Sequence, residues 1–308
     1  MQNTPIGNTP LVHLDRCTEH PHIQIWAKLE EFNLTGSVKA RAAWNIIDTA
    51  EKNGLLRPNG CIVDASSGNT GIAYAAIAAM KGYTLNLCIP SNVNTERKKL
   101  LQAYGANCIF TSPLEGSDGA IRTAQRLAKE NPDWFYADQY NNEANWLAHY
   151  HGTGPEIWKQ SQGKVTHFVS SLGTSGTFVG TSRYLKEISQ NRILCYTVEP
   201  DSPFHGLEGM KHMASAIVPG IYDSSLATEH LESPTEESLE LIPWVAKTQG
   251  LLIGPSCAAA LYAAMQLAHR LQHAATAENP ICIVLIFADS GERYLSEKHI
   301  WSTTTTGH

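Results

Sequence analysis

The chain has 308 residues, of which 43% are hydrophobic and 17% charged, values typical of a globular protein with a sizeable core. This length allows one large domain or two smaller ones. The net charge of −6, without a long basic run, argues against a nucleic-acid partner. The longest strongly apolar run, residues 281–288, is far too short to span a bilayer, so no membrane partner is expected either.

The cysteines and the first residues indicate the cellular compartment. Seven cysteines are an odd number, no CxxC pair occurs, and the opening residues lack the charged and apolar parts of a signal peptide. We therefore expect a reducing, cytoplasmic location. The thirteen histidines show no metal-ligand spacing, so no metal site is expected.

Short apolar segments alternate with helix-like segments along the chain. In chain order, the hydrophobic pattern predicts helix 41–50, strand 61–64, helix 71–80, strand 85–89, helix 95–104, strand 107–111, helix 117–130, strand 167–171, helix 178–189, strand 193–198, helix 235–248, strand 251–253, helix 256–272 and strand 281–287. Ser233 and Glu236 have the spacing of a capping box for the helix that begins at 235. The threonine-rich tail, 303–308, is expected to be disordered.

This alternation indicates an α/β fold with two open, twisted parallel sheets, each covered by helices on both faces. The strand–helix units form one block before about residue 145 and another after about residue 155. We therefore expect two α/β domains with ligands at the carboxyl ends of the strands. Residues 200–230 lack periodicity and are rich in Gly, Pro and His, which is compatible with a functional loop or with a surface excursion.

Lys39 stands among small residues, in TGSVKAR (residues 35–41), where a loop runs into an expected helix. Burial disfavours the ammonium form of lysine and lowers its pKa, which frees the amine to attack a carbonyl carbon. Solvated loop lysines have the same local pattern. The segment alone therefore leaves a Schiff-base lysine and a surface lysine open.

A loop rich in serine, threonine and glycine, SSGNTG (residues 66–71), lies between an expected strand and an expected helix. The unpaired N–H groups of a helix N-terminus, together with these hydroxyls, would bind a carboxylate or a phosphate. A helix cap needs only one such residue. The loop therefore favours ligand binding over capping alone.

A second loop of this kind, LGTSGT (residues 172–177), follows the strand expected at 167–171. The glycines at 173, 176 and 180 match neither the GxGxxG fingerprint nor a GK[ST] phosphate loop. A nucleotide is therefore disfavoured, while a compact phosphate remains open. Ser256, in GPSCA (254–258), is by itself better explained as the cap of the following helix.

Six motifs together resemble the pyridoxal-phosphate-dependent cysteine synthases (O-acetylserine sulfhydrylases). In chain order they are IGNTPL (6–11), GSVKAR (36–41), SSGNTG (66–71), GTSGT (173–177), GPSCA (254–258) and SGERYL (290–295). The resemblance implies the tryptophan-synthase-β-like fold of type II pyridoxal-phosphate enzymes, with the cofactor in the cleft between two domains. The smaller, mobile domain would cover about 36–145, and about 1–35 with 146–308 would form the larger. It also implies a homodimer.

The resemblance assigns a role to each motif. Lys39 would hold pyridoxal 5′-phosphate covalently and act as the catalytic base, Asn69 would bond to the cofactor's ring oxygen, and Ser256 would meet its ring nitrogen. The cofactor phosphate would be bound by Gly173, Thr174, Ser175, Gly176 and Thr177. The carboxylate of the amino-acid substrate would be bound by Ser66, Ser67, Gly68, Thr70 and Gln139.

These roles imply a transferase of cysteine biosynthesis. It would eliminate the leaving group of an O-activated L-serine, O-acetylserine or O-phosphoserine, and add sulfide or another sulfur donor to the resulting aminoacrylate. A neutral serine at the ring nitrogen makes a weaker electron sink than an aspartate, which favours this β-elimination over transamination. The chain departs from the family at Ala40, where aspartate is usual, and at Cys257-Ala258, where the turn usually reads Ser-Gly.

The segment GLEGMKHM (206–213), followed by IVPG (217–220), resembles the B-type cysteine synthases, which place a cation about where Lys211 stands. A cation there would receive a phosphate leaving group or a charged sulfur donor such as thiosulfate. A solvated loop lysine is the alternative interpretation.

Other functions stay open at this stage. Cystathionine β-synthase and serine or threonine dehydratase use the same cofactor and the same kinds of residues. A cofactor-free binding module, with its cleft reused for a peptide or protein partner, is the non-enzyme alternative. The intact Lys39 and both anion-binding loops count against that module.

Overall fold

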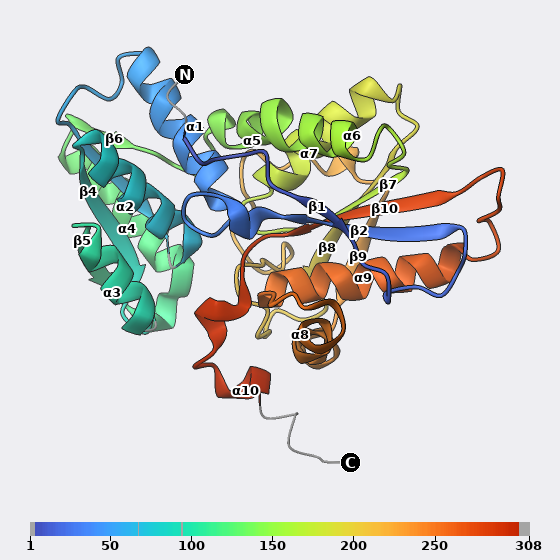
Figure 1. The fold of residues 1–308 in the computed structure, drawn as a ribbon. Helices are drawn as coiled ribbons and strands as arrows, with labels where there is room; N and C mark the ends of the chain where they lie inside the picture. Colours follow the sequence, from blue (N-terminus) through green and yellow to red (C-terminus); the bar gives the residue numbers. More distant parts are fainter. Residues whose placement is uncertain (1–3, 67, 94, 302–308) are drawn as a thin grey trace.

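The computed structural model describes residues 4–66, 68–93 and 95–301, and within them the strands form two separate sheets (Figure 1). The smaller sheet is parallel throughout and has the order β5-β4-β3-β6. Its strands are β3 Cys61–Ala65, β4 Thr84–Pro90, β5 Asn107–Thr111 and β6 Trp134–Tyr136.

The larger sheet has six strands in the order β1-β2-β10-β7-β8-β9. They are β1 Leu11–His13, β2 Ile23–Leu29, β7 His167–Ser171, β8 Leu194–Pro200, β9 Glu229–Ser233 and β10 Ile281–Phe287. Only β1 pairs antiparallel with its neighbour among these described strands. Every residue of β10 is buried, because this strand lies inside the sheet and helices cover both of its faces.

Helices cover both faces of each sheet (Figure 1). Around the smaller sheet, α1 Lys39–Lys52, α2 Asn69–Lys81 and α3 Thr95–Ala103 lie on one face and α4 Gly116–Glu130 on the other. Around the larger sheet, α5 Glu143–Ala148, α6 Gly154–Gln160 and α7 Gly176–Ile188 cover one face, and α8 Thr235–Gln249 and α9 Pro255–Leu271 the other.

Short helical turns complete the fold. A π-helical turn, His149–Thr153, joins α5 to α6, and α10 Lys298–Trp301 ends the described chain. The 3-10 turns are Glu30–Phe32, Pro113–Glu115, Ser224–Leu226 and Gly291–Tyr294. No helix in the described part is long and apolar enough to cross a membrane. The expected disorder of 303–308 concerns residues outside that part.

The predicted α/β architecture with two sheets is confirmed, whereas two local predictions are wrong. Residues 251–253 form no strand, and Ile253 makes only an isolated bridge with Ser290. The capping box at α8 does not form, because the Ser233 hydroxyl bonds with the Ser238 hydroxyl at 2.6 Å instead. Strands β1 and β2 belong to the larger sheet; the domain boundaries near 35 and 145 stay a prediction.

A buried ion cluster fixes the start of α1. Arg41 Nε lies 2.6 Å from Glu30 Oε2, and Arg41 Nη2 lies 2.7 Å from Glu156 Oε2. Lys28 Nζ reaches the same Glu156 oxygen at 2.7 Å. Burial opposes ionisation of Glu156, but Arg41 and Lys28 outweigh it and lower the pKa of Glu156 to about 2. The first turn of α1, which begins with Lys39, is therefore held against the Glu30–Phe32 turn that follows β2 and against α6.

Candidate active site

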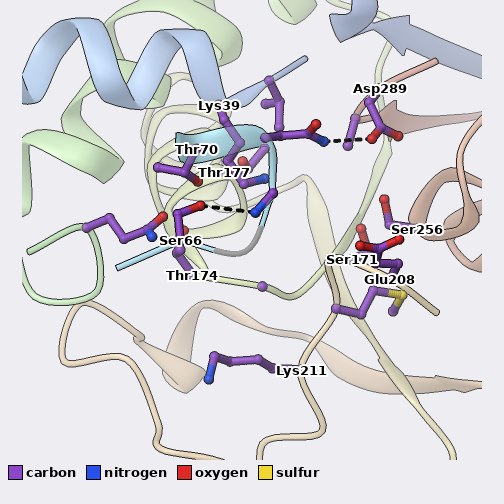
Figure 2. A pocket seen from close by; sticks show the side chains of 18 of the residues that line it. Lys39, Ser66, Thr70, Ser171, Thr174, Thr177, Glu208, Lys211, Ser256 and Asp289 are labelled. Atoms are coloured by element: carbon purple, nitrogen blue, oxygen red, sulfur yellow. Dashed lines mark hydrogen bonds between the residues drawn. The ribbon is translucent and has the colours of Figure 1, made fainter. Parts of the chain in front are cut away.

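A cavity of about 170 Å³ lies between the two sheets, where β3 and β7 end and α2 and α7 begin (Figure 2). One water needs only about 10–15 Å³ of such space, so the cavity has room for a small organic ligand. Both anion-binding loops predicted from the sequence open into it, one from each sheet. This position is the usual ligand site of open α/β sheets.

The structure brings the predicted site residues together. Those that line the cavity are Lys39, Ser66, Gly68, Asn69, Thr70, Gln139, Gly173, Thr174, Ser175, Thr177, Lys211 and Ser256. Gly176 does not line it, and Ser67 lies outside the described residues. The roles that the resemblance gives to these side chains stay predictions, whereas their convergence on one cavity is observed.

Lys39 is the first residue of α1, and backbone contacts with the segment after β10 position it. Val38 N–H donates to Ala288 O at 2.8 Å, and Ser37 forms a bridge with Asp289. Burial lowers the pKa of Lys39, while the Asp289 carboxylate opposes this shift. The amine is therefore moved toward the neutral, nucleophilic form, and the interpretation of Lys39 as a solvated loop lysine is wrong.

The loop before α2 combines capping with an open anion site. Ser66 Oγ accepts the N–H of Gly71 at 2.9 Å and that of Gly68 at 3.3 Å, so one hydroxyl serves the helix start. Thr70 and Asn69 still face the cavity. The loop therefore keeps polar groups beyond those that capping uses.

Asp64 supports the same loop from the end of β3. It is fully buried, and its carboxylate accepts the N–H of Ala65 at 2.8 Å and that of Gln139 at 3.3 Å. Gln139 Nε2 in turn donates to Ala65 O at 2.7 Å. Burial raises the pKa of Asp64 to about 7, although both N–H groups oppose the shift. This carboxyl therefore titrates near neutral pH directly below a predicted carboxylate-binding side chain.

The loop before α7 fits a phosphate group. Ser175 Oγ is buried, and none of the described residues offers it a hydrogen-bond partner. Glycine is required on both sides of this turn, since a Cβ on Gly176 would lie 2.0 Å from Asn145 Oδ1 and a Cβ on Gly173 2.6 Å from Gly209 O. An unpaired buried hydroxyl at a helix N-terminus is the donor that a phosphate would satisfy.

Ser256 is not a helix cap. The N-cap of α9 is Gly254, so Ser256 lies within the first turn, is 8% exposed and faces the cavity. Cys257 beside it is buried, with Sγ 3.4 Å from Asp289 O. Ala40 is also fully buried, so an aspartate there would place a carboxylate in the interior. The departures at 40 and 257 thus both fall at packed positions.

Asp289, Arg293 and Tyr294 received no role from the sequence, and the structure joins them with Asn69 in one network at the cavity. Asn69 Nδ2 donates to Asp289 Oδ2 at 2.7 Å, and the Tyr294 hydroxyl donates to the same oxygen at 2.7 Å. Arg293 donates to Asn69 Oδ1. The only signal in the sequence was their place in SGERYL and just before it.

Two cations face the cavity from opposite sheets. Arg97, on α3, pairs with Glu208, and its guanidinium lies 5.6 Å from the centroid of the Tyr294 ring. Lys211 Nζ lies 3.8 Å from Asp118 Oδ1 and 5.1 Å from the centroid of the Tyr140 ring. The Lys211 side chain is only 10% exposed, so its interpretation as a solvated lysine is wrong. Figure 2 shows it across the cavity from Lys39.

Comparisons with known proteins agree with this site. The family model described as "Pyridoxal-phosphate dependent enzyme" matches residues 3–286. A cysteine synthase of Aquifex aeolicus is 45% identical over 94% of this chain and 89% of its own length. Cysteine synthase B of Salmonella typhimurium is 39% identical over 94% and 93%.

A solved structure extends the similarity to three dimensions. The crystal structure of a cysteine synthase (OASS) from Entamoeba histolytica superposes with a TM-score of 0.90 at 36% identity, covering 99% of this chain and 91% of its own. Sequence identity at this level over nearly the whole length shows both the fold and the family of this chain. The chain belongs to the pyridoxal-phosphate-dependent enzyme family.

Proposed function

We propose that the protein is a pyridoxal-phosphate-dependent cysteine synthase, which forms L-cysteine from an O-activated L-serine and sulfide. One observation carries the proposal: Lys39, with its lowered pKa, lies between a loop suited to phosphate and a loop suited to carboxylate. Similarity to cysteine synthases over nearly the whole chain supports the reaction class.

The cofactor would be held at three points. Lys39 would attach to it, the loop from Gly173 to Thr177 would hold its phosphate, and Ser256 would meet its ring nitrogen. When bound, pyridoxal phosphate supplies an electron sink for the bond that breaks at the substrate. Ser256 is neutral, so it supports ring-nitrogen binding without fixing a positive charge there.

The chain's own residues would bind and deprotonate the substrate. Ser66 accepts two backbone N–H groups, which leaves its O–H free to donate to a substrate carboxylate, together with Thr70 and Gln139. The Lys39 amine, released from the cofactor when the substrate amine takes its place, would accept the proton from the substrate Cα. Asp289 faces that amine and moderates its pKa, so the ammonium that forms has a nearby counter-charge.

Lys211 is our candidate for choosing the leaving group. Burial lowers its pKa and Asp118 opposes the shift, and its side chain closes one end of the cavity. A cation there would interact more strongly with a phosphate leaving group than with acetate. We therefore propose that Lys211 extends the substrates from O-acetylserine to O-phosphoserine, and the sulfur donors to charged ones.

We also propose a cytoplasmic homodimer with a smaller mobile domain around the four-stranded sheet. The support is the resemblance of the motifs to cysteine synthases, together with the similarity of the whole chain to them. Light scattering after size-exclusion chromatography tests the dimer, and a mass of about one chain would contradict it.

The decisive experiment combines spectroscopy with product analysis. The purified protein should be yellow, and borohydride should fix a pyridoxyl group on the peptide that carries Lys39. Incubation with O-acetylserine and sulfide should give cysteine. Incubation with O-acetylserine and homocysteine should give little cystathionine, and O-acetylserine without a second substrate should give little pyruvate. Preferential cystathionine would indicate a cystathionine β-synthase, and preferential pyruvate a dehydratase. A colourless protein that takes up no added cofactor would falsify the proposed function.

A further inference from the structure

Arg97 and Glu208 meet in the cavity from opposite halves of the molecule. Arg97 lies on α3, which packs with the four-stranded sheet, and Glu208 lies in the loop between β8 and β9 of the six-stranded sheet. The Arg97 side chain is 6% exposed and that of Glu208 39%. The pair therefore places a mainly buried guanidinium and an accessible carboxylate in one ligand site.

The backbone around Glu208 is fixed to the proposed phosphate loop. Lys211 N–H donates to Leu172 O at 2.8 Å, and Gly209 O packs directly against Gly173. Glu208 is thus directly followed by a segment that contacts the proposed phosphate loop through Gly209 and Lys211. Its carboxylate is held at Arg97 by the fold as well as by charge.

The two cations of the cavity are paired unequally. Lys211 lies 3.8 Å from Asp118, the outer limit of an ion pair, and Asp118 does not line the cavity. Arg97 is in hydrogen-bonding contact with Glu208, which does line it. Burial lowers the pKa of Arg97, but the contact with Glu208 outweighs burial, so the pKa is raised above its ordinary value. Lys211 is therefore the cation that an incoming anion reaches more easily.

We propose that Glu208 is a specificity-determining residue, whose carboxylate occupies the guanidinium of Arg97 and keeps oxyanions away from it. An arginine fork binds phosphate or a sulfur oxyanion through two parallel hydrogen bonds, but here the Glu208 carboxylate already accepts a hydrogen bond from Arg97 Nη1 and pairs with its charge. Sulfide needs no such fork. The inference rests on the proposed function, because it concerns which sulfur donors and leaving groups this cavity admits.

Substitution of Glu208 by glutamine tests the proposal. The change keeps the size and polarity of the side chain at position 208 but removes its negative charge. The mainly buried Arg97 guanidinium then lacks this counter-charge, so binding of another anion becomes more favourable. Inorganic phosphate is the probe, titrated into the holoenzyme and followed through cofactor absorbance. The cofactor fills its own phosphate loop there, so the titration reports on the rest of the cavity. E208Q should bind phosphate roughly tenfold more tightly than the unchanged protein.

The matched control is Glu229→Gln. Glu229 also pairs with an arginine, Arg270, and its side chain is 44% exposed, but it lies on β9 outside the cavity. E229Q should leave phosphate affinity unchanged. The double variant R97M/E208Q should lose the gain, since the fork itself is gone. An E208Q affinity within twofold of the unchanged protein, or an equal gain in E229Q or in R97M/E208Q, overturns the proposal.

A kinetic arm separates this inference from the proposed function. The ratio of kcat/KM for thiosulfate to that for sulfide should rise roughly tenfold in E208Q, and an unchanged ratio also contradicts the role of Glu208. If the unchanged protein takes up no cofactor, the proposed function fails. The difference in phosphate affinity between the cofactor-free E208Q and R97M/E208Q variants, measured by calorimetry, then still decides whether Glu208 blocks Arg97, because phosphate bound at residues 173–177 is common to both.

Discussion

Asn69 Nδ2 donates a 2.7 Å hydrogen bond to Asp289 Oδ2, which joins the loop before α2 to the segment after β10. Asp289 is 1% exposed and also accepts the Tyr294 hydroxyl at 2.7 Å. The buried Asp289 carboxylate therefore already orients the Asn69 amide, which the resemblance to cysteine synthases assigns to the cofactor's ring oxygen. The same carboxylate acts on Lys39 electrostatically, so one residue influences two predicted cofactor contacts.

Asp289→Asn should shift the pH dependence of cofactor attachment. Attachment needs the neutral amine, and Asp289 raises the pKa of Lys39 against the stronger lowering by burial. Removing its charge lowers that pKa further, so the rate of covalent uptake by the apoprotein should reach its midpoint at lower pH. Stopped-flow absorbance across pH measures this. Asp133→Asn, an exposed control, should not move the midpoint, and a rise of the midpoint in D289N would exclude the electrostatic role.

Lys39→Ala should abolish turnover but not non-covalent cofactor binding. Loss of the proposed base alone removes roughly 10²–10⁴-fold of rate, and the covalent link is lost as well. Both anion-binding loops remain, so pyridoxal phosphate should still bind, and borohydride should no longer label the protein. Lys52→Ala is the control on the same helix, since that side chain is 73% exposed. Cysteine formation by K39A at the rate of K52A would refute the assignment.

Ser175→Ala should have opposite effects on the apoprotein and on cofactor binding. The change removes a buried hydroxyl that none of the described residues satisfies, so the apoprotein should melt at the same temperature or higher. The proposed hydrogen bond from Ser175 to the cofactor phosphate would also be lost, which should weaken cofactor binding by about 1.5–3 kcal/mol. Differential scanning fluorimetry and absorbance titration measure the two effects.

The matched control for Ser175 is Thr181→Val. Thr181 Oγ1 is also buried without a partner among the described residues, but it lies further along α7 and does not line the cavity. T181V should change cofactor affinity little. Equal losses of affinity in both variants would show that Ser175 acts through packing and not through the phosphate.

Asp64→Asn should remove a pH-dependent penalty on stability. Burial raises the pKa of Asp64 to about 7 in the folded state, against about 3.9 in the unfolded chain. Its contribution to stability is therefore present below about pH 4 and lost as the pH rises through 7, on the order of 4 kcal/mol in total. Urea unfolding from pH 4 to 8 should show the stability of D64N rising relative to the unchanged protein. A difference independent of pH would contradict this pKa.

Lys211→Ala should affect two activated serines unequally. Loss of the cation should reduce kcat/KM for O-phosphoserine by roughly tenfold more than for O-acetylserine, because the phosphate ester is already charged when it binds, whereas the acetyl ester is neutral until it leaves. Steady-state assays with saturating sulfide measure both. Lys164→Ala, an exposed lysine before β7, is the control. An equal loss with both substrates would sink the role of Lys211 in choosing the leaving group.

The sequence predicted the interior of the fold better than its edges. Continuous apolar runs such as β10 mark parallel strands that are covered on both faces, and most of these strands were found. Strand β2, which pairs with β10 inside the larger sheet, was missed, because polar residues interrupt its sequence IQIWAKL. Strand β9, with the sequence EHLES, carries no such pattern, and β6, with the sequence WFY, is only three residues long. Pairing with a neighbour defines both strands. Residues 251–253 show the opposite case, an apolar run that forms no strand. Leu251, Leu252 and Ile253 are apolar, yet the segment after β10 gives them only one isolated bridge, between Ile253 and Ser290.

The candidate site divides in a similar way. Lys39 and the two anion-binding loops were recognisable because each is a local chemical pattern in front of a helix. Arg97 gave no such signal, since an arginine in a polar helix is usually solvated, and only the approach of Glu208 from 111 positions away brings it into the site. Asp289 was invisible for the same reason, as Asn69 lies 220 positions away.

The buried cluster around Arg41 has an evolutionary consequence. Lys28, Glu30, Arg41 and Glu156 carry two positive and two negative charges in a largely sealed space. Loss of any one leaves an uncompensated charge in the interior, at a cost of about 3–5 kcal/mol. These four positions should therefore covary among homologues, changing jointly or hardly at all, even though none of them lines the cavity. The constraint reaches the site through Arg41, which lies two residues from Lys39.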